Sequence, residues 1–211
     1  MTTPGMSQSL CVNEITRVSK AFHPTFTTCA RAYAYLIDIG SNRISSSQPV
    51  ERDDLSRSST LSTFNMLVEE KAEEQVILLN SMLRKLEGKK MDYNGLSYGK
   101  VTTSNTFCTL YHARAQLVEY EYHENSSATA DEQQLRKKRA VCVELVGDRF
   151  LRRMVRLLIE ASVRLVAIAF ANNEKSEDAL IELIRKNDRK LVGRPAPPDG
   201  LIFVGARVQS K

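Results

Sequence analysis

The stretch VGDRFLRRMVRLLIE, residues 146–160, joins the end of an apolar strand to the start of a long helix. Over residues 150–170, apolar side chains recur at helical spacing and form one stripe that is expected to face the core. Asp148 stands just before this helix and is suited to cap its first turn. The stretch therefore predicts a strand, a turn and a helix. Its arginines lie off the apolar stripe: Arg152, Arg153, Arg156 and Arg164.

Upstream of this stretch the sequence predicts one strand and one helix. Residues 30–39 (ARAYAYLIDI) alternate small or charged residues with apolar ones, which is the period-2 pattern of a strand. Residues 69–86 carry apolar side chains at helical spacing, with acidic residues first, basic residues last and Gly88 as a stop. Residues 41–63 are rich in Ser, Arg and Asp and predict a long inserted loop.

The rest of the chain predicts two strands before the long helix, then a helix and a strand after it. The two strands are expected at residues 111–122 and 140–146, and the polar residues 123–139 predict a second inserted loop. A shorter helix is expected from the N-cap candidate Ser176 to near residue 187. A last strand is expected over residues 201–208.

This order of elements predicts an α+β fold, with helices packed on a largely antiparallel mixed sheet. With 211 residues and 42% apolar content, the chain is long enough for a single domain over residues 1–211. No stretch is apolar enough to span a bilayer, and the four cysteines lack a CxxC spacing. We therefore expect an intracellular protein without a membrane segment, a disulfide framework, a metal or a cofactor. The net charge of +5 permits an acidic partner such as nucleic acid.

Four segments, in order, resemble the C-terminal half of the TruA family of tRNA pseudouridine synthases. FHPTFTTCARAYAYLI at residues 22–37 is similar to that family's F-H-A-R-F-S-A-x-x-R-x-Y-x-Y-x-I, and residues 146–160 are similar to its F-[LV]-x-x-M-V-R helix start. LEGKKMDY at residues 86–93 and APPDGLIFVGARV at residues 196–208 are weaker matches. The resemblance implies the fold of a pseudouridine synthase half and an RNA partner, tRNA.

The chain also departs from the family pattern. Pro24 and Thr25 stand where the family usually has Ala and Arg, and Glu160 replaces a usual Gly where the helix approaches a neighbour closely. The family's catalytic aspartate lies in an R-T-D-x-G-V-H run of an N-terminal half, and this chain begins just after the position of that run. We therefore expect no catalytic residue here, and a partner chain or homodimer mate that supplies the catalytic half.

No other aspartate has the context of a catalytic carboxylate. In this family one aspartate acts as nucleophile or base while the N1–C1′ bond of uridine breaks and the base rejoins through C5. Asp38 ends a predicted strand, Asp92 matches a family position that is not catalytic, and Asp148 is expected to cap a helix. The chain alone is therefore expected to be inert.

The resemblance implies that part of a uridine pocket is present. Tyr33 aligns with the tyrosine that packs against the target nucleotide, and Arg156 aligns with an arginine turned toward the active-site cleft. Leu201 and Phe203 align with the apolar wall of the uracil pocket. Each of these residues also has a structural interpretation, because a strand tyrosine and apolar strand residues suit a core, and a helix arginine suits a solvated face.

Cationic residues predict contacts with RNA phosphates. The run RKKR is expected in a loop, where a charge run is equally compatible with simple solvation. His23 and Cys29 lack a third residue that would orient them as a catalytic pair, and His112 and His123 lack metal-ligand spacing. The RNA-binding candidates are Arg31, Arg136, Lys137, Lys138, Arg139, Arg152 and Arg153.

The leading hypothesis is therefore an RNA-modification domain of a tRNA pseudouridine synthase, either a fragment or one chain of a split enzyme. The alternative is a non-catalytic RNA-binding module, or a ribonucleoprotein assembly factor, derived from the same fold. An R-T-D-x-G-V-H segment in an upstream reading frame or in a co-purifying protein would discriminate between the two.

Overall fold

The structure is a computed structural model that describes residues 17–18, 20, 22–23, 27–39, 67, 69–99, 105–123 and 135–208. The loop expected at residues 41–63 lies outside the described residues, as do Pro24 and Thr25. Residues 124–134, the centre of the second expected loop, also lie outside them.

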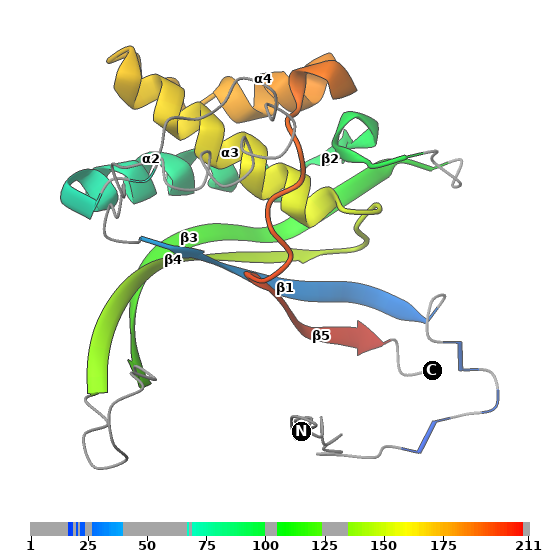
Figure 1. The fold of residues 1–211 in the computed structure, drawn as a ribbon. Helices are drawn as coiled ribbons and strands as arrows, with labels where there is room; N and C mark the ends of the chain where they lie inside the picture. Colours follow the sequence, from blue (N-terminus) through cyan, green and yellow to red (C-terminus); the bar gives the residue numbers. More distant parts are fainter. Residues whose placement is uncertain are drawn as a thin grey trace, which may run out of the picture.

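In the described part of the chain, five strands form one antiparallel sheet in the order β2-β3-β4-β1-β5. Three described helices lie together on one face of this sheet (Figure 1). This arrangement confirms the predicted α+β fold. The strands are β1 (Thr28–Asp38), β2 (Lys90–Asp92), β3 (Phe107–His123), β4 (Leu135–Gly147) and β5 (Leu201–Val208). The helices are α2 (Ala72–Arg84), α3 (Met154–Ala171) and α4 (Ala179–Lys186), with 3-10 turns at Glu69–Lys71, Asn94–Leu96 and Arg189–Leu191.

β5 matches the sequence prediction, β1 and β3 match it with shifted ends, and β4 and β2 differ from it. β5 covers residues 201–208 as expected. β4 begins at Leu135, so the segment 135–139, expected in a loop, is strand. β2 was not expected, because three residues are too few to show a period-2 pattern.

The long helix begins later than predicted because tertiary contacts hold the turn before it. Asp148 accepts a hydrogen bond from the Thr109 backbone nitrogen at 2.9 Å, so the prediction that it caps the helix is wrong. Arg153, the residue before the helix, has a φ of 60°. Ser176 is likewise not the N-cap of α4, because this helix begins at Ala179. The next two residues, Glu177 and Asp178, form ion pairs with Lys85 at 3.3 and 2.9 Å.

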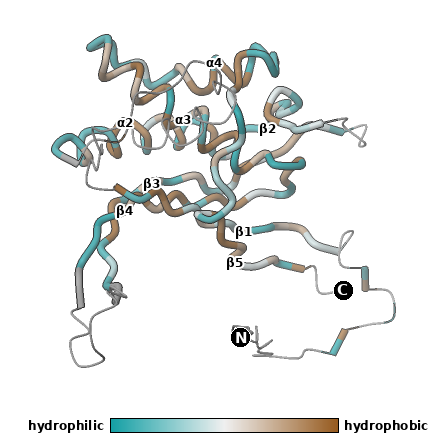
Figure 2. Tube along the Cα trace, in the orientation of Figure 1, coloured by the Kyte–Doolittle hydropathy of each residue, from teal (hydrophilic) through white to brown (hydrophobic). Residues whose placement is uncertain are grey.

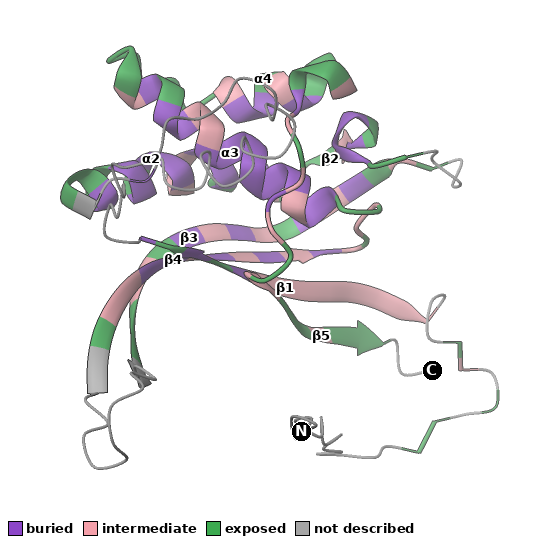
Figure 3. Ribbon diagram, in the orientation of Figure 1, coloured by how far each residue is buried: buried purple, intermediate pink, exposed green. Residues whose placement is uncertain are grey.

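The hydrophobic core lies between the helices and the sheet. In β1, Tyr35 and Ile37 are buried and Leu36 between them is exposed, so alternate side chains face the helices. Hydrophobic residues gather in this interlayer space, and hydrophilic residues lie on the outer turns of the helices (Figure 2). Figure 3 shows burial along most of α3, the helix at the centre of the layer. No described helix is both long and apolar enough to cross a membrane.

β3 and β4 extend past the helix layer as a curved hairpin arm (Figure 1). Cross-strand partners in the arm carry opposite charges, with Glu119 opposite Arg139 and Glu121 opposite Lys137. Asp38 at the end of β1 forms an ion pair with Lys138 and accepts a hydrogen bond from the Tyr120 hydroxyl at 3.0 Å. The base of the arm is thus tied to β1 through side chains.

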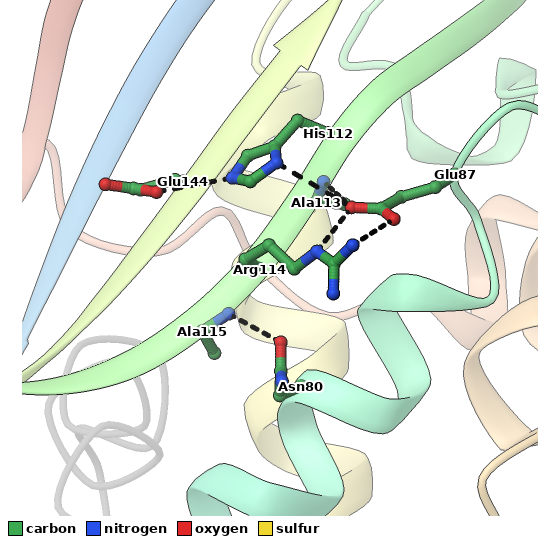
Figure 4. Close-up of polar contacts among 7 residues, drawn as sticks. All are labelled: Asn80, Glu87, His112, Ala113, Arg114, Ala115 and Glu144. Carbon is green, nitrogen blue, oxygen red and sulfur yellow. Dashed lines mark hydrogen bonds and ion pairs between the residues drawn. The ribbon is translucent and has the colours of Figure 1, made fainter.

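Beyond its pairing with β2, the edge of β3 has no neighbouring strand. Side chains from α2 and from the turn after it accept hydrogen bonds from the backbone N–H groups along this edge. The Glu87 carboxylate accepts hydrogen bonds from the Ala113 backbone nitrogen and from two guanidinium nitrogens of Arg114, all at 2.8 Å (Figure 4). The Asn80 side-chain oxygen accepts one from the Ala115 backbone nitrogen at 3.1 Å. These contacts take the place of a neighbouring strand and fasten α2 to the sheet.

The edge contact predicts a large difference between two glutamate substitutions. Glu87→Ala should lower the free energy of unfolding by about 1–3 kcal/mol, because it leaves the buried Ala113 N–H and the Arg114 guanidinium without their acceptor. Glu74→Ala is the matched control: its carboxylate is 66% exposed and pairs with Lys175. Such an exposed pair contributes about 0–1 kcal/mol. Urea unfolding of both variants tests this, and equal losses would contradict it.

Candidate functional site

An aromatic cluster lies where β1 and β5 meet the turn before α3. Its centre is Tyr33 of β1, whose ring centroid lies 5.1 Å from that of Phe150 in the turn before α3, with an angle of 82° between the rings. The ring centroid of Phe203 in β5 lies 5.3 Å from that of Tyr33, and the two residues are partners in the β1–β5 ladder. Because Phe203 is 58% exposed, the cluster reaches the surface.

The segment between α4 and β5 is fastened to α3 and β1 beside this cluster. The Arg156 guanidinium donates to the Ala196 carbonyl oxygen, and the Ala196 backbone nitrogen donates back to the Arg156 carbonyl oxygen at 3.0 Å. The Leu36 backbone nitrogen donates to the Gly200 carbonyl oxygen at 2.9 Å. A Cβ at Gly200 would lie 2.4 Å from the Leu36 carbonyl oxygen, so this close approach requires glycine. These contacts place Leu201, the ladder partner of Tyr35, beside the cluster.

Tyr35 holds the segment before β5 against β1 through a hydrogen bond and does not act as an acid or base. Its hydroxyl donates to the Pro197 carbonyl oxygen at 2.7 Å. Burial raises the pKa of Tyr35 to about 12, an effect that nearby Arg156 opposes and Asp199 reinforces. The phenol therefore remains a neutral hydrogen-bond donor at physiological pH, and the segment before β5 remains tied to β1.

Glu160 in α3 contacts the segment between α4 and β5 at an earlier position, Gly193. Its side chain is 7% exposed, and one carboxylate oxygen accepts from Arg164 Nε at 3.1 Å while the Gly193 backbone also donates to the carboxylate. A Cβ at Gly193 would lie 2.3 Å from this carboxylate, so the loop supplies the glycine that makes room for the buried glutamate. Glu160 Oε2 has no hydrogen-bond partner among the described residues. Burial raises the pKa of Glu160 above its ordinary value, and Arg164 opposes this shift.

The arginines before α3 are exposed, and one has an aromatic partner. The Arg153 guanidinium lies 4.0 Å from the centre of the Tyr98 ring, in a cation–π contact. The carbonyl oxygen of Arg152 accepts from the Tyr98 backbone nitrogen at 3.1 Å. Arg31 lies elsewhere, in β1 opposite Gly147 of β4 and Ala206 of β5. Arg152 and Arg153 thus contact Tyr98, whereas Arg31 lies on a central strand of the sheet.

The predicted basic run at 136–139 is strand and not loop, and two of its members already have acidic partners. Lys138 pairs with Asp38, and Arg139 pairs with Glu73 at 3.1 Å. Lys137 is exposed, and the side chain of Arg136 lies outside the described residues. Cross-strand pairing thus explains the position of this run, and a role in RNA binding stays a prediction.

The aspartates considered from the sequence hold the backbone or neighbouring side chains. Asp92 accepts hydrogen bonds from the Asn94 backbone nitrogen at 3.0 Å and the Asn187 side chain at 2.7 Å. Asp38 and Asp148 are engaged in the contacts given above. His112 lies 3.3 Å from Glu144 and 3.9 Å from Glu87, and Cys29 donates to the Arg207 carbonyl oxygen at 3.3 Å. The described residues hold no group of three or more His, Cys, Asp or Glu suited to a metal ion.

Sequence reasoning missed two members of the site and one anchor. Phe150 was noted only as a motif residue, although it packs edge-on against Tyr33. Tyr35 lies two residues after Tyr33, and alternate residues of a strand share one face of the sheet. The sequence could therefore have indicated that Tyr35 lies beside Tyr33. The role of Glu160 had no sequence signal, because Gly193 is its neighbour only in the folded chain.

The buried glutamate predicts a pH dependence of stability. The folded-state pKa of Glu160 lies above its ordinary value near 4.5, so the folded protein holds this proton more tightly than the unfolded chain. The free energy of unfolding of the wild type, relative to Glu160→Gln, should therefore be highest below about pH 4.5 and fall as the pH rises toward the folded-state pKa. Urea unfolding of both proteins across this range tests the sign; a difference that is constant or rises would contradict it.

Comparison with known proteins identifies the family. A family model described as tRNA pseudouridine synthase matches residues 82–207, from α2 to β5. The match includes Arg156, Leu201 and Phe203, and Tyr33 lies before it. No curated protein matches the chain. Since the match covers more than half of the 211 residues, the chain belongs to the tRNA pseudouridine synthase family, whose substrate is tRNA.

Proposed function

We propose that this chain is the C-terminal half of a TruA-type pseudouridine synthase, that it binds tRNA, and that it forms one wall of the uridine site. The observation that carries the proposal is the cluster of Tyr33, Phe150 and Phe203, which brings together three distant segments and reaches the surface. Arg156 and Leu201 are positioned beside the cluster by the segment that precedes β5. Aromatic rings of this kind stack on nucleic-acid bases.

The proposed wall suits a base that must move. In the reaction the N1–C1′ bond of uridine breaks, the uracil turns, C5 bonds to C1′, and the proton on C5 leaves. A wall of directional hydrogen bonds would hold the base in one orientation, whereas apolar and aromatic surfaces retain it without fixing the direction of its edges. Tyr33, Leu201 and Phe203 offer such a surface.

The contacts of three aspartates in this chain favour a catalytic nucleophile that is supplied by another segment or chain. Asp38, Asp92 and Asp148 each accept hydrogen bonds that hold the fold, so using any of them as a nucleophile would break those contacts. We therefore infer that the catalytic aspartate belongs to a segment that faces this wall, on a partner chain or a homodimer mate. The competing function is a non-catalytic RNA-binding module, which the engagement of these carboxylates also favours.

The proposal predicts that these 211 residues alone do not isomerise uridine. In tRNA labelled with tritium at C5 of uridine, the purified chain should release tritium at the background rate, because Asp38, Asp92 and Asp148 are engaged in contacts that hold the fold. Adding an N-terminal half with the R-T-D-x-G-V-H run from a related enzyme should raise the rate. Activity of the chain alone would contradict the prediction, and failure of complementation would favour the RNA-binding module.

The proposal also predicts the effects of changing the wall in the complemented enzyme. Tyr33→Ala should lower kcat/KM by about 5- to 150-fold, the range for losing one base–aromatic stack, whereas Tyr33→Phe keeps the ring and should have a small effect. Arg156→Lys should also lower kcat/KM, because an ammonium does not reproduce the planar guanidinium that donates to Ala196.

Val204→Ala is the control for these wall variants, since Val204 lies on β5 and is 63% exposed. Urea unfolding of each variant separates lost stability from lost catalysis. Activity that is unchanged in both Tyr33→Ala and Arg156→Ala would assign these residues to the scaffold alone.

A further inference from the structure

We propose that a hollow at the β2 edge of the sheet binds an unpaired nucleotide of the tRNA, away from the target uridine. In this site the Phe107 ring stacks on the base, and Lys89, Lys90 and Arg185 bind the phosphates. The inference rests on the proposed function, because it takes tRNA as the partner of this chain.

The hollow lies where the end of α4 contacts β2 (Figure 1). Its volume is about 520 Å³. This lies within the range of roughly 300–1,000 Å³ that small-ligand sites have. The residues that line it come from β2, from the start of β3 and from the end of α4, and they include Lys89, Lys90, Asp92, Phe107, Arg185 and Asn187.

Hydrogen bonds hold the two sides of the hollow together. The Asn187 side-chain nitrogen donates to the Asp92 carboxylate at 2.7 Å, and the Asn187 oxygen accepts from the Gly95 backbone nitrogen at 2.6 Å. Asp92 is the ladder partner of Phe107, and Lys90 lies two residues before it on β2. Ladder partners and alternate residues share a face, so these three side chains lie on one side of the β2–β3 pair. The carboxylate on that side is the one that contacts the end of α4.

Three cations and one carboxylate line the hollow, so its net charge is positive. Lys89, Lys90 and Arg185 are exposed and form no ion pair with an acidic side chain in the part of the chain that the structure describes. The carboxylate of Asp92 accepts hydrogen bonds from two neutral N–H groups instead. In contrast, Lys85, four residues before Lys89, has two carboxylate partners. Cations without carboxylate partners are free to form charge-assisted hydrogen bonds with phosphate.

Stabilisation of a helix end explains only part of this charge. Arg185 lies in the last turn of α4, where the negative end of the helix dipole favours a cation. Lys89 and Lys90 lie before β2 and in β2, not in a helix. Their convergence on Arg185 therefore favours an anionic ligand that contacts all three.

Phe107 supplies the surface for a base. It is 46% exposed, and its ring has no aromatic or cationic partner among the described residues. The next residue in β3, Cys108, is fully buried, so strand alternation turns Phe107 away from the core. An exposed ring beside several cations is the combination that binds single-stranded nucleic acid without regard to sequence.

The hollow is separate from the proposed uridine wall. In the sheet, β3 and β4 lie between β2 and β1, the strand that carries Tyr33. Neighbouring strands lie about 4.8 Å apart, so β2 and β1 are roughly 14 Å apart. A nucleotide in the hollow is therefore not the target uridine. It contributes to the affinity for tRNA and takes no part in the bond changes at C1′.

Oligonucleotide binding by the full chain tests the hollow. The probe is a single-stranded oligouridylate, and its Kd is measured over a range of KCl concentrations for the wild type and for Lys89→Gln, Lys90→Gln, Arg185→Gln and Phe107→Ser. Each cation variant should lower the slope of log K against log salt by ~0.7. Phe107→Ser should weaken binding about 5- to 150-fold, whereas Phe107→Tyr keeps the ring and should bind within about twofold of the wild type. Urea unfolding of each variant identifies any loss that comes from stability.

Lys71→Gln is the matched control, because Lys71 is an exposed lysine without an acidic partner among the described residues. It directly precedes α2, whose 13 residues separate it from the turn that leads to Lys89. At 1.5 Å per residue this separation is about 20 Å. The control should leave both the slope and the Kd unchanged.

A second readout needs no variant, because 5-iodouridine in the oligonucleotide should photo-crosslink to the wild-type peptide that contains Phe107. Unchanged slopes and affinities in the hollow variants, or crosslinks only to other peptides, would overturn the proposal. Slopes that change in the cation variants while Phe107→Ser binds like the wild type would also overturn it, since they indicate attraction of phosphate without a nucleotide site.

The complemented enzyme separates the two proposals. A contact remote from the chemistry should act on KM, so Lys90→Gln and Phe107→Ser should raise the KM for tRNA more than they lower kcat. If tritium release is restored and KM is the same in these variants and the wild type, the hollow fails and the uridine wall stands. If no aspartate-bearing half restores activity but the oligonucleotide effects appear as predicted, the hollow stands and the catalytic proposal fails. A wild-type chain that binds neither oligouridylate nor tRNA would overturn both.

Discussion

Helix α3 has to be covered on nearly every side, and the rest of the structure follows from this requirement. Its buried residues lie around most of its circumference, so no single neighbour suffices to remove them from water. α2 and α4 both contact it, and the segment after α4 crosses it on the way to β5. Even its charged residue Glu160 is buried, under the loop at Gly193. The neighbouring helices and the segment before β5 are therefore positioned by contact with this one helix.

The positions of the site residues depend on this covering segment. From Gly193 to Gly200 its backbone is bound first by Glu160, then by Arg156, then by the Tyr35 hydroxyl and Leu36. The segment therefore enters β5 in a fixed register, which places Phe203 opposite Tyr33. The exposed cluster has little packing of its own, since Phe203 is more than half exposed. Its geometry is supported instead by hydrogen bonds in the layer behind it.

The sequence was most informative where a local pattern and the fold agree. β5 could be predicted residue by residue, because a Pro-rich turn and a run of strand-forming residues coincide there. Asp148 was assigned to a helix cap by a local rule, but the Thr109 N–H, a partner from a distant strand, is the donor it meets. The run at 136–139 contains only cations, so it shows no alternation. Its strand character depends on β3, whose Glu119 and Glu121 lie opposite.

The same distinction between local and tertiary information applies to charge. The net charge of +5 and the RKKR run both pointed to RNA, yet a cation attracts phosphate fully only if no carboxylate already neutralises it. Lys138 and Arg139 are partly neutralised by Asp38 and Glu73, although they lie in the most basic stretch of the chain. Arg31 and Arg207 are isolated in sequence, yet they lie on neighbouring strands β1 and β5 and have no acidic partner among the described residues. Strand pairing, more than local composition, therefore determines which cations of this chain are available to a nucleic acid.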